Sequence, residues 1–499
     1  MARSDSARGA AAAFCGCGAS RHRFRRAAQS AFAGVHQALG AAAFFRPRQF
    51  SFCHSIQSLS GARRESIFIG AGSSACVGLS RPALGMVLDY PRRKAMKRIL
   101  YIHHGGALGG APLSLLLLLQ QLDRSCFEPI VLCLAAGPVV ERFRAAGIET
   151  HVATDISDFS QTELVWYGNA LLWQLPGKAL RFLPSVTAAR RYLRHFQPDL
   201  VHLNSSTLAA PAQAAFQERL PVVWHIREPL ARGYFGLRRR WLRRRIARHA
   251  TRVVAVSEND AAQLLRSDRI RVIHNFVDFA IFDHSIDLDA ARAHLNLTPA
   301  QHVVTMLGGC SAPKGTLPFV RALPLVRAKI PNTRFLVAGP KPQVGASKPL
   351  PALLKRLSRA DAYDRAVMAA AGASIASGAL RFLGDRDDVP RLLVASDLLV
   401  FPSVVPHFAR PVIEAGAMAK PVVASDLGGP RELVRHDETG LLIPPNNPQK
   451  LAEAIIAILS DPARARAMCV AGYRRACELF DAQKNAARTF AIYEELIGT

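Results

Sequence analysis

Three charged side chains stand where strand-like segments give way to helix-like segments. Pro411 opens a helix after a strand and a loop, and we expect Glu414 in its first turn, where the carboxylate can accept hydrogen bonds from ribose hydroxyls. Arg410 directly precedes that proline, and a guanidinium can fork two phosphate oxygens. Lys314, in the turn after another strand, offers a mobile point charge to a phosphate. These residue types suit recognition of a ribose and its phosphates.

The elements that position Glu414 and Arg410 lie in residues 381–445. Short β-branched runs alternate there with helix-length patterns, which is typical of βαβ units in a parallel sheet. A helix that begins after a parallel strand offers its N-terminus to an anion. A second glycine turn, Gly428-Gly429, follows the next strand and permits close approach to the backbone. The expected strands are Leu398–Phe401, Pro421–Ala424 and Gly440–Ile443.

The same stretch carries a longer ordered pattern, whose members are Pro402, Ser403, Phe408, Pro411, Glu414, Ala415, Pro421 to Asp426, Gly428, Gly429 and Glu432. This pattern resembles the donor-site half of retaining glycosyltransferases of the GT-B fold, in group 1 and family 4. The resemblance implies an α/β protein with two Rossmann-like domains that face each other across a cleft. It also implies metal-independent transfer of a sugar, with retention of configuration, from a nucleotide-diphosphate sugar to a glycan, lipid-linked or other acceptor. Pro406 stands where the family has its first glutamate, and His407 and Ala409 stand where it has glycines.

The resemblance also implies which residues contact the donor. The family clamps the donor diphosphate with an arginine and a lysine; Lys314 matches the lysine, whereas Gly309 stands at the arginine. We predict that Arg410 supplies the missing charge, the alternative being that it points into solvent. His407 either assists or fills the space left by the usual glutamate, and in the family the turn from Gly384 to Val389 meets the base. The implied donor-binding residues are Gly308, Lys314, Gly384, Val389, His407, Phe408, Ala409, Arg410, Glu414, Gly428 and Gly429.

A glycine-rich turn at residues 105–110 follows the expected strand Arg98–His103 and precedes a helix that Pro112 opens. Glycine there lets a ligand approach the helix start, although such turns are as often packing devices. In the resembled family this loop lies across the cleft from the donor phosphates. Gly109 and Gly110 are therefore candidates for the acceptor side or a phosphate loop.

Two side chains at the end of a later strand are catalytic candidates alongside Lys314 and Arg410. A family histidine near the reacting sugar falls in register on Arg227, and His225 lies two residues earlier on the same strand face. The alternatives are that His225 is a hydrogen-bonded core histidine and that Arg227 forms a structural ion pair with Glu228.

The remaining strand patterns divide the chain into two α/β halves. We expect an N-terminal acceptor domain at residues 96–280, a C-terminal nucleotide-sugar donor domain at 281–480, and a helix at 481–499 that returns to the first domain. Residues 1–95 lack a hydrophobic period, and we interpret them as a disordered extension, a transit peptide or an over-extended reading frame. The other expected strands are Pro129–Cys133, Glu149–Ala153, Leu200–Leu203, Val222–Ile226, Val253–Val256, Arg271–Ile273, His302–Leu307, Arg334–Ala338 and Leu380–Leu383.

The 499-residue chain has a formal net charge of +27, which nucleic-acid-binding proteins also show. Residues 1–95 carry +11 of that charge, and residues 232–252 contain nine arginines and no acidic residue. We predict that this arginine cluster docks the protein on anionic lipid, the alternative being a solvated helix face. Nucleic-acid binding rests on charge alone, because stacking aromatics are not interleaved over a basic surface apart from the short run at residues 232–252, and we expect no such binding. The apolar residues within the cluster are Phe235, Leu237, Trp241, Leu242 and Ile246.

Two Asp-x-Asp triplets, Asp287–Asp289 and Asp385–Asp387, are interpreted as helix-start or turn carboxylates, and we expect no metal cofactor. The sequence has no apolar run of about 18 residues, so we predict a cytoplasmic protein, peripheral on the inner face of the plasma membrane at most. A degenerate GT-B protein that binds nucleotide sugar or a partner without turnover remains the alternative, because Pro406 and Gly309 both depart from the pattern.

Overall fold

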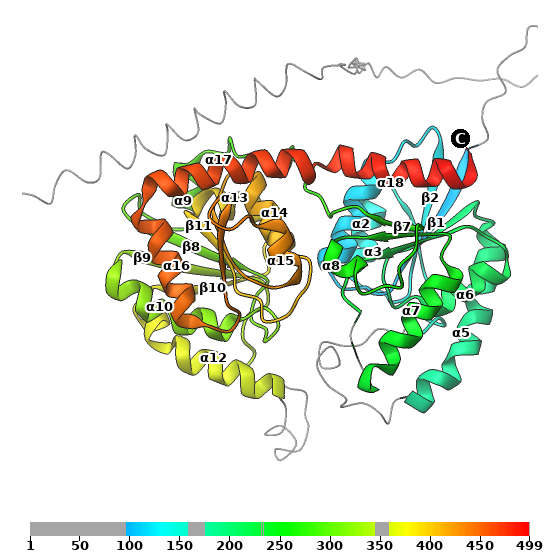
Figure 1. The fold of residues 1–499 in the computed structure, drawn as a ribbon, viewed down its shortest axis with the longest axis horizontal. Helices are drawn as coiled ribbons and strands as arrows, with labels where there is room; N and C mark the ends of the chain where they lie inside the picture. Colours follow the sequence, from blue (N-terminus) through cyan, green and yellow to red (C-terminus); the bar gives the residue numbers. More distant parts are fainter. Residues whose placement is uncertain (1–95, 158–174, 231, 233, 345–358, 499) are drawn as a thin grey trace, which may run out of the picture. The chain divides into compact units, whose positions relative to one another are not determined.

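The computed structural model describes residues 96–157, 175–230, 232, 234–344 and 359–498 (Figure 1). The expected extension at residues 1–95 lies outside the described residues. Those described form two all-parallel sheets flanked by helices, which confirms the predicted α/β class with two Rossmann-like sheets. We call the elements from β1 to β7 the N-terminal half and those from α9 to α17 the C-terminal half. The predicted domain boundaries stay predictions.

The sheet of the N-terminal half has the strand order β3-β2-β1-β4-β5-β6-β7. It is buried on both faces: Leu100 and Ile102 of β1 pack into one core, whereas Ile99 and Tyr101 pack into the other. Burial on both faces explains why such a strand is an unbroken apolar run in the sequence. The elements are β1 (Lys97–His103), α2 (Gly110–Gln120), β2 (Phe127–Cys133), α3 (Pro138–Ala145), β3 (Glu149–Val152), α5 (Leu175–Phe196), β4 (Leu200–Leu203), α6 (Ala209–Gln217), β5 (Val222–Ile226), the 3-10 turn η2 (Tyr234–Gly236), α7 (Leu237–His249), β6 (Arg252–Ala255), α8 (Glu258–Ala261) and β7 (Ile270–Val272).

The sheet of the C-terminal half has the strand order β10-β9-β8-β11-β12-β13. It is also buried on both faces, because Val304 and Met306 of β8 pack into one core and Val303 and Leu307 into the other. The elements are α9 (Leu288–His294), β8 (His302–Leu307), α10 (Thr316–Lys329), β9 (Thr333–Ala338), α12 (Arg359–Ala376), β10 (Leu380–Gly384), α13 (Val389–Ala395), β11 (Leu398–Phe401), α14 (Arg410–Ala417), β12 (Val422–Ser425), α15 (Gly428–Leu433), β13 (Gly440–Ile443), α16 (Pro448–Ser460) and α17 (Pro462–Leu479).

The last helix, α18 (Ala482–Ile497), packs on elements of the N-terminal half and lies beside α2 (Figure 1). Ala486, Ile492 and Tyr493 are buried in the same core as Tyr101 of β1. The Tyr493 hydroxyl lies 2.7 Å from Nδ1 of His202 on β4. The end of the chain is therefore anchored to the sheet that begins at β1.

In the arginine-rich helix α7, fewer of the apolar side chains are exposed than its sequence indicates. Leu242 and Ile246 are buried in the core of the N-terminal half and are not available to a lipid surface. Arg240, Arg244 and Arg248 are exposed. Among the residues that the structure describes, no helix is both long and apolar enough to cross a membrane.

Candidate active site

Two loops, after β8 and after β11, are held against each other in the C-terminal half. The Ser403 hydroxyl donates a hydrogen bond of 3.0 Å to the Pro313 carbonyl oxygen. Gly315 has a φ of +76°, and a Cβ there would lie 1.8 Å from the Pro402 carbonyl oxygen, so this position requires glycine. The contact fixes Lys314 beside the loop that leads into α14.

Lys314 and His407 meet across these two loops. Lys314 Nζ lies 2.9 Å from His407 Nε2 and 5.5 Å from the centroid of the Phe401 ring. His407 Nδ1 lies 3.1 Å from the Val405 carbonyl oxygen, so we assign the ring proton to Nδ1, and Nε2 accepts from the lysine. Burial, with a further contribution from the Lys314 charge, lowers the pKa of His407 to about 3. His407 is therefore neutral near pH 7 and positions a charged ammonium.

The backbone beside Lys314 contains two glycines in the left-handed region, Gly308 at φ +118° and Gly309 at φ +69°. A Cβ on Gly308 would lie 3.3 Å from the Lys314 side chain. A Cβ on Gly309 would lie 2.4 Å from the Pro340 backbone nitrogen, so this backbone does not accommodate an arginine at position 309. The departure from the family pattern is therefore built into the packing of the β8 turn.

Glu414 does not lie in the first turn of α14, which corrects our expectation from the sequence. The helix begins at Arg410, so Glu414 is its fifth residue. Its Oε1 lies 2.8 Å from Arg410 Nε, and both side chains are buried. Burial raises the pKa of Glu414, and the neighbouring guanidinium opposes that shift. Glu414 thus has a protein partner beside any contact it makes with ribose.

Arg410 is 9% exposed, so the alternative that it points into solvent is wrong. Its Nη1 donates to the Ser114 hydroxyl of α2 at 3.0 Å and to the Phe276 carbonyl oxygen at 3.4 Å. A Cβ built on Gly110 would lie 4.0 Å from Arg410 Cδ, and one built on Gly109 would meet nothing within 4 Å. The structure therefore brings Gly110 of the predicted loop beside Arg410.

The second glycine turn packs against the loop that carries His407. A Cβ on Gly428 would lie 2.6 Å from Pro406 Cβ, and one on Gly429 would lie 2.3 Å from the His407 carbonyl oxygen. These glycines are required by contact between two loops. Phe408 and Ala409 are buried in the core beneath them.

The expected base-side turn begins at Gly384, which has a φ of +83° and whose carbonyl oxygen accepts from the Gly339 N–H at 2.8 Å. Val389 is half-buried and begins α13. In the acidic triplets, the Asp287 side chain caps α9 by accepting from the Ala290 N–H at 2.6 Å, as predicted for a helix-start carboxylate. In the part of the chain that the structure describes, no group of three or more His, Cys, Asp or Glu side chains is arranged to hold a metal.

His225 lies inside the N-terminal half beside the ring of His202, with ring centroids 5.3 Å apart. It is 2% exposed, and neither ring nitrogen has a hydrogen-bond partner among the described residues. The alternative of a hydrogen-bonded core histidine is therefore right about the position of the ring in the core and wrong about its hydrogen bonds, since the described residues provide no partner. Burial holds the pKa of His225 well below its usual range, so the ring is neutral.

Arg227 is held by the side chains of two asparagines. Its Nε donates to Asn204 Oδ1, and its Nη1 donates to Asn275 Oδ1 at 2.8 Å. Glu228 accepts from the Ser206 N–H at 2.7 Å instead of facing Arg227. The sequence does not predict these two contacts, because each joins residues far apart in the chain.

Two family models match the chain. The model described as Glycosyltransferase Family 4 matches residues 108–280, and the model described as Glycosyl transferases group 1 matches residues 301–461. The chain belongs to these glycosyltransferase families. The two matches fall on the N-terminal and C-terminal halves, respectively, so the resemblance that was carried mainly by residues 381–445 extends over both sheets.

Similar proteins agree with this family. The chain is 30% identical over 236 residues to a D-inositol 3-phosphate glycosyltransferase of Jonesia denitrificans, covering 46% of this chain and 51% of the relative. It is 29% identical over 255 residues to the lipopolysaccharide core biosynthesis mannosyltransferase LpsB of Rhizobium meliloti, covering 50% and 68%. The chain thus spans about half the length of the first of these curated relatives. The crystal structure of Anabaena HepE in complex with UDP has a TM-score of 0.64 at 23% identity, covering 80% of this chain and 100% of HepE, and shows the GT-B fold.

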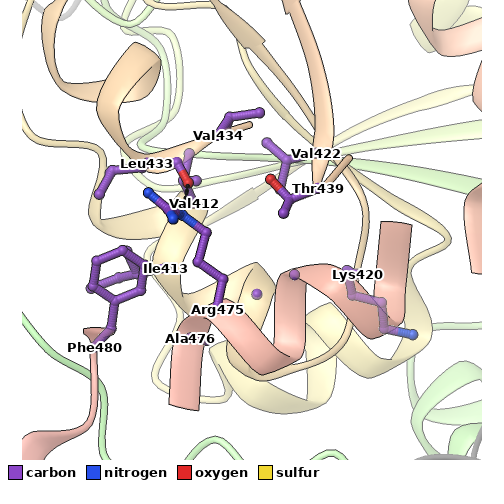
Figure 2. A pocket seen from close by; sticks show the side chains of 12 residues that line it. Val412, Ile413, Lys420, Val422, Leu433, Val434, Thr439, Arg475, Ala476 and Phe480 are labelled. Atoms are coloured by element: carbon purple, nitrogen blue, oxygen red, sulfur yellow. Dashed lines mark hydrogen bonds between the residues drawn. The ribbon is translucent and has the colours of Figure 1, made fainter. Parts of the chain in front are cut away.

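A small cavity lies in the C-terminal half of this GT-B chain, between α14, α17 and the β12 region, and none of the predicted donor residues lines it (Figure 2). Its volume of ≈ 20 Å³ accommodates roughly one water molecule. We therefore assign it to imperfect packing around Arg475 and not to the donor. The lining residues are Val412, Ile413, Gly416, Lys420, Val422, Leu433, Val434, Thr439, Gly472, Arg475, Ala476 and Phe480.

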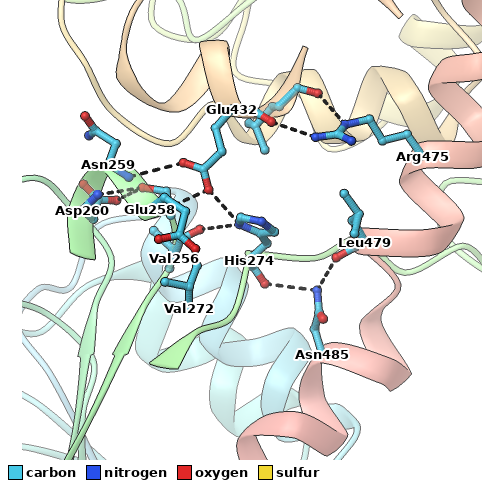
Figure 3. Close-up of polar contacts among 12 residues, drawn as sticks. Val256, Glu258, Asn259, Asp260, Val272, His274, Glu432, Arg475, Leu479 and Asn485 are labelled. Atoms are coloured by element: carbon cyan, nitrogen blue, oxygen red, sulfur yellow. Dashed lines mark hydrogen bonds and ion pairs between the residues drawn. The ribbon is translucent and has the colours of Figure 1, made fainter. Parts of the chain in front are cut away.

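A carboxylate of the C-terminal half binds the start of α8 in the N-terminal half (Figure 3). Glu432 Oε1 accepts from the Glu258 N–H at 2.9 Å, and Oε2 accepts from the Asn259 N–H at 3.4 Å. Glu432 Oε1 also lies 3.6 Å from His274 Nδ1. Arg475 of α17 donates to the Glu432 carbonyl oxygen at 2.9 Å. The family pattern identified Glu432 but not its partners, which are distant in the sequence.

Proposed function

We propose that this chain transfers a sugar from a nucleotide-diphosphate sugar to an acceptor, with retention of configuration and without a metal. The observation that carries the proposal is the Lys314 ammonium, held at the carboxyl ends of the C-terminal sheet by a neutral His407. A diphosphate leaving group gains negative charge as the glycosidic bond breaks. A preorganised cation stabilises that charge more in the transition state than in the ground state. Membership of the glycosyltransferase families supports the same reaction.

The proposed donor is a UDP-sugar. The HepE structures, at 23% and 24% identity, were solved with UDP and with UDP-glucose. In the proposed arrangement Lys314 and Arg410 face the diphosphate, Glu414 faces the ribose, and the turn from Gly384 to Val389 faces the base. The glycines at 428 and 429 keep the His407 loop in place.

The proposed acceptor is a glycan or a lipid-linked sugar. One relative is named for D-inositol 3-phosphate, which supports a polar, anionic acceptor, and another for lipopolysaccharide core biosynthesis, which supports a lipid-linked glycan. Exposed apolar side chains near α7 support a lipid surface: Phe235 is 80% exposed and Leu237 65%. On α5, Leu180 and Leu183 are also exposed, and Phe182 of that helix packs on Trp241 of α7 with ring centroids 5.7 Å apart.

The test is transfer by the purified protein with a panel of UDP- and GDP-sugars in the presence of EDTA. NMR spectroscopy of the product gives its anomeric configuration, and we expect an α-linked product from an α-linked donor. Lys314→Met should lower the turnover number by about 100-fold or more. Lys329→Met removes an exposed lysine at the end of α10 and serves as the matched control. A β-linked product contradicts retention, and dependence on added metal contradicts the metal-independent mechanism.

A protein that binds nucleotide sugar without turnover is the second candidate. It is favoured by one observation, namely that Pro406 replaces the family's first glutamate while Gly309 replaces the arginine. Calorimetric binding of UDP together with no transfer and no donor hydrolysis for any sugar in the panel would establish this function. Turnover with any donor would exclude it.

A further inference from the structure

Two buried arginines from opposite halves contact neighbouring residues of one segment. Arg227 follows β5 in the N-terminal half, and Arg410 begins α14 in the C-terminal half; they are 7% and 9% exposed. Arg227 Nη1 donates to the Asn275 side chain at 2.8 Å, and Arg410 Nη1 lies 3.4 Å from the Phe276 carbonyl oxygen. Because Asn275 and Phe276 are successive residues, the two guanidiniums lie on the same short stretch of backbone.

Both arginines are also tied to the first turns of α2. Asn204, the partner of Arg227 Nε, donates to the Ala111 carbonyl oxygen at 3.3 Å. Arg410 Nη1 donates to the Ser114 hydroxyl at 3.0 Å. The contacts therefore close a ring that runs from Arg227 through α2 to Arg410 and back through the segment 275–276.

The positive charge of this ring is not balanced by the described side chains that contact it. Arg227 contacts neutral asparagine oxygens, whereas Arg410 has one carboxylate, Glu414. Nη2 of each guanidinium is buried without a hydrogen-bond partner among the described residues. Unpaired buried polar groups are costly, and charged ones more so. Burial lowers the pKa of Arg227 to about 9, Tyr493 and the nearby Glu228 charge oppose that shift, and Arg410 adds to it, so Arg227 still carries its charge at pH 7.

The start of α2 adds backbone donors to the same place. The helix has neither an acidic residue in its first turn nor a side chain that caps its N-terminus. Gly106 earlier in the loop is a packing glycine, because a Cβ there would lie 2.1 Å from the Ala136 carbonyl oxygen. Packing does not explain Gly109, which faces open space, or Gly110, which faces Arg410 Cδ at 4.0 Å. Open backbone at a helix start favours an anion.

We propose that Arg227 and Arg410 together bind one anionic group of a substrate, a phosphate or a carboxylate, at the start of α2. Arg227 is then a specificity-determining residue that binds the same anionic group as an arginine of the other half. The inference rests on the proposed transferase function and deepens it. The anionic group is either the donor diphosphate or a charged substituent on the acceptor or the transferred sugar, and these two sources have the same chemistry at the guanidiniums.

The experiment is calorimetric titration of wild type and Arg227→Gln with two probes, UDP and inorganic phosphate, the second both alone and after saturation with UDP. Arg142→Gln removes an exposed arginine of α3 and is the matched control. We expect Arg227→Gln to lower the affinity of the protein for one of the two probes by at least about tenfold. Weaker UDP binding identifies the donor diphosphate as the anion. Unchanged UDP binding with weaker phosphate binding in the presence of UDP identifies the charged substituent.

Equal affinity of wild type and Arg227→Gln for both probes overturns the proposal. A thermal melt without ligand separates binding from scaffolding. A residue that merely supports the fold lowers the melting temperature when replaced, whereas removing a buried charge that no carboxylate contacts leaves it unchanged or higher. Arg227→Lys, which keeps the charge, should retain part of the lost affinity. If wild type binds no UDP, the proposed function fails, and phosphate alone then decides the two-arginine site.

Discussion

Asp260 is a buried carboxyl group that links stability to pH at the scale of a single residue. It is 1% exposed, and the Ser257 hydroxyl donates to its Oδ2 at 2.7 Å. Burial, assisted by the charges of Glu228 and Glu432 and opposed by Ser257, raises the pKa of Asp260 from 3.8 to about 7. The folded state therefore retains a proton that the unfolded state releases above pH 3.8. The contribution of Asp260 to stability is complete below pH 3.8 and is lost as the pH rises to about 7.

Asp260→Asn should remove this dependence, because an amide does not ionise. Between pH 5 and pH 8.5, the free energy of unfolding of the variant should gain about 2 kcal/mol relative to wild type. Urea denaturation at the two pH values measures the difference. Asp268→Asn, at an exposed carboxylate just before β7, is the control and should show no such gain. A constant difference between Asp260→Asn and wild type over this range would refute the assignment.

Glu414 is predicted to anchor the ribose of the donor, although it also contacts Arg410 at 2.8 Å. Glu414→Gln keeps the side-chain shape and should weaken UDP binding by about 1–3 kcal/mol. Because the same change also alters the Arg410 contact, affinity alone does not identify ribose. The deciding measurement is discrimination between UDP and its 2′-deoxy and 3′-deoxy analogues. We expect wild type to discriminate and the variant not to; equal discrimination by both would refute the ribose contact.

At the scale of the element, α7 carries most of the arginine cluster at residues 232–252 that is predicted to dock on anionic lipid. We expect cosedimentation with vesicles that contain anionic lipid, decreasing with salt, because each arginine near the surface contributes about 1 kcal/mol. Replacing the exposed Arg240, Arg244 and Arg248 with glutamine should weaken that binding. Three arginine-to-glutamine changes elsewhere on the exposed surface, at Arg142, Arg321 and Arg391, keep the net charge equal and form the control. Equal binding to neutral and anionic vesicles would remove the hypothesis.

Elements were the scale at which the sequence predicted most. All thirteen expected strands are present with ends that differ by at most two residues, because strands buried on both faces are apolar runs bounded by turn residues. The predicted position of Glu414 in the first turn of α14 was wrong, because the helix begins one residue before the proline that we took as its start. The interleaved apolar residues of α7 did not reveal which ones face the core, since that depends on α6 and the sheet. The contacts of Arg227 with Asn204 and Asn275 could not be predicted from the sequence for the same reason, because tertiary packing alone determines them.

At the scale of the whole molecule, the two halves are joined by polar contacts from different elements. Arg410 reaches α2, while Glu432 accepts from the first N–H groups of α8. These contacts join loops of the two halves. Polar contacts of this kind can exchange for water when the halves separate, so we expect the contacts to contribute to closure around substrate.

Glu432 tests that expectation, because its carboxylate binds a helix start that belongs to the other half (Figure 3). Glu432→Gln keeps a neutral hydrogen-bond acceptor, whereas Glu432→Ala removes the acceptor. The alanine variant should lower the stability of the closed arrangement by about 1–2 kcal/mol, and the glutamine variant by less. Hydrogen exchange at the amides of Glu258 and Asn259 should be faster in Glu432→Gln than in wild type, and fastest in Glu432→Ala. The KM for donor should rise more than the turnover number falls, since closure precedes chemistry. Glu438→Ala, at an exposed carboxylate of the same half, is the control. Unchanged exchange at α8 in Glu432→Ala would show that the carboxylate does not hold the halves together in solution.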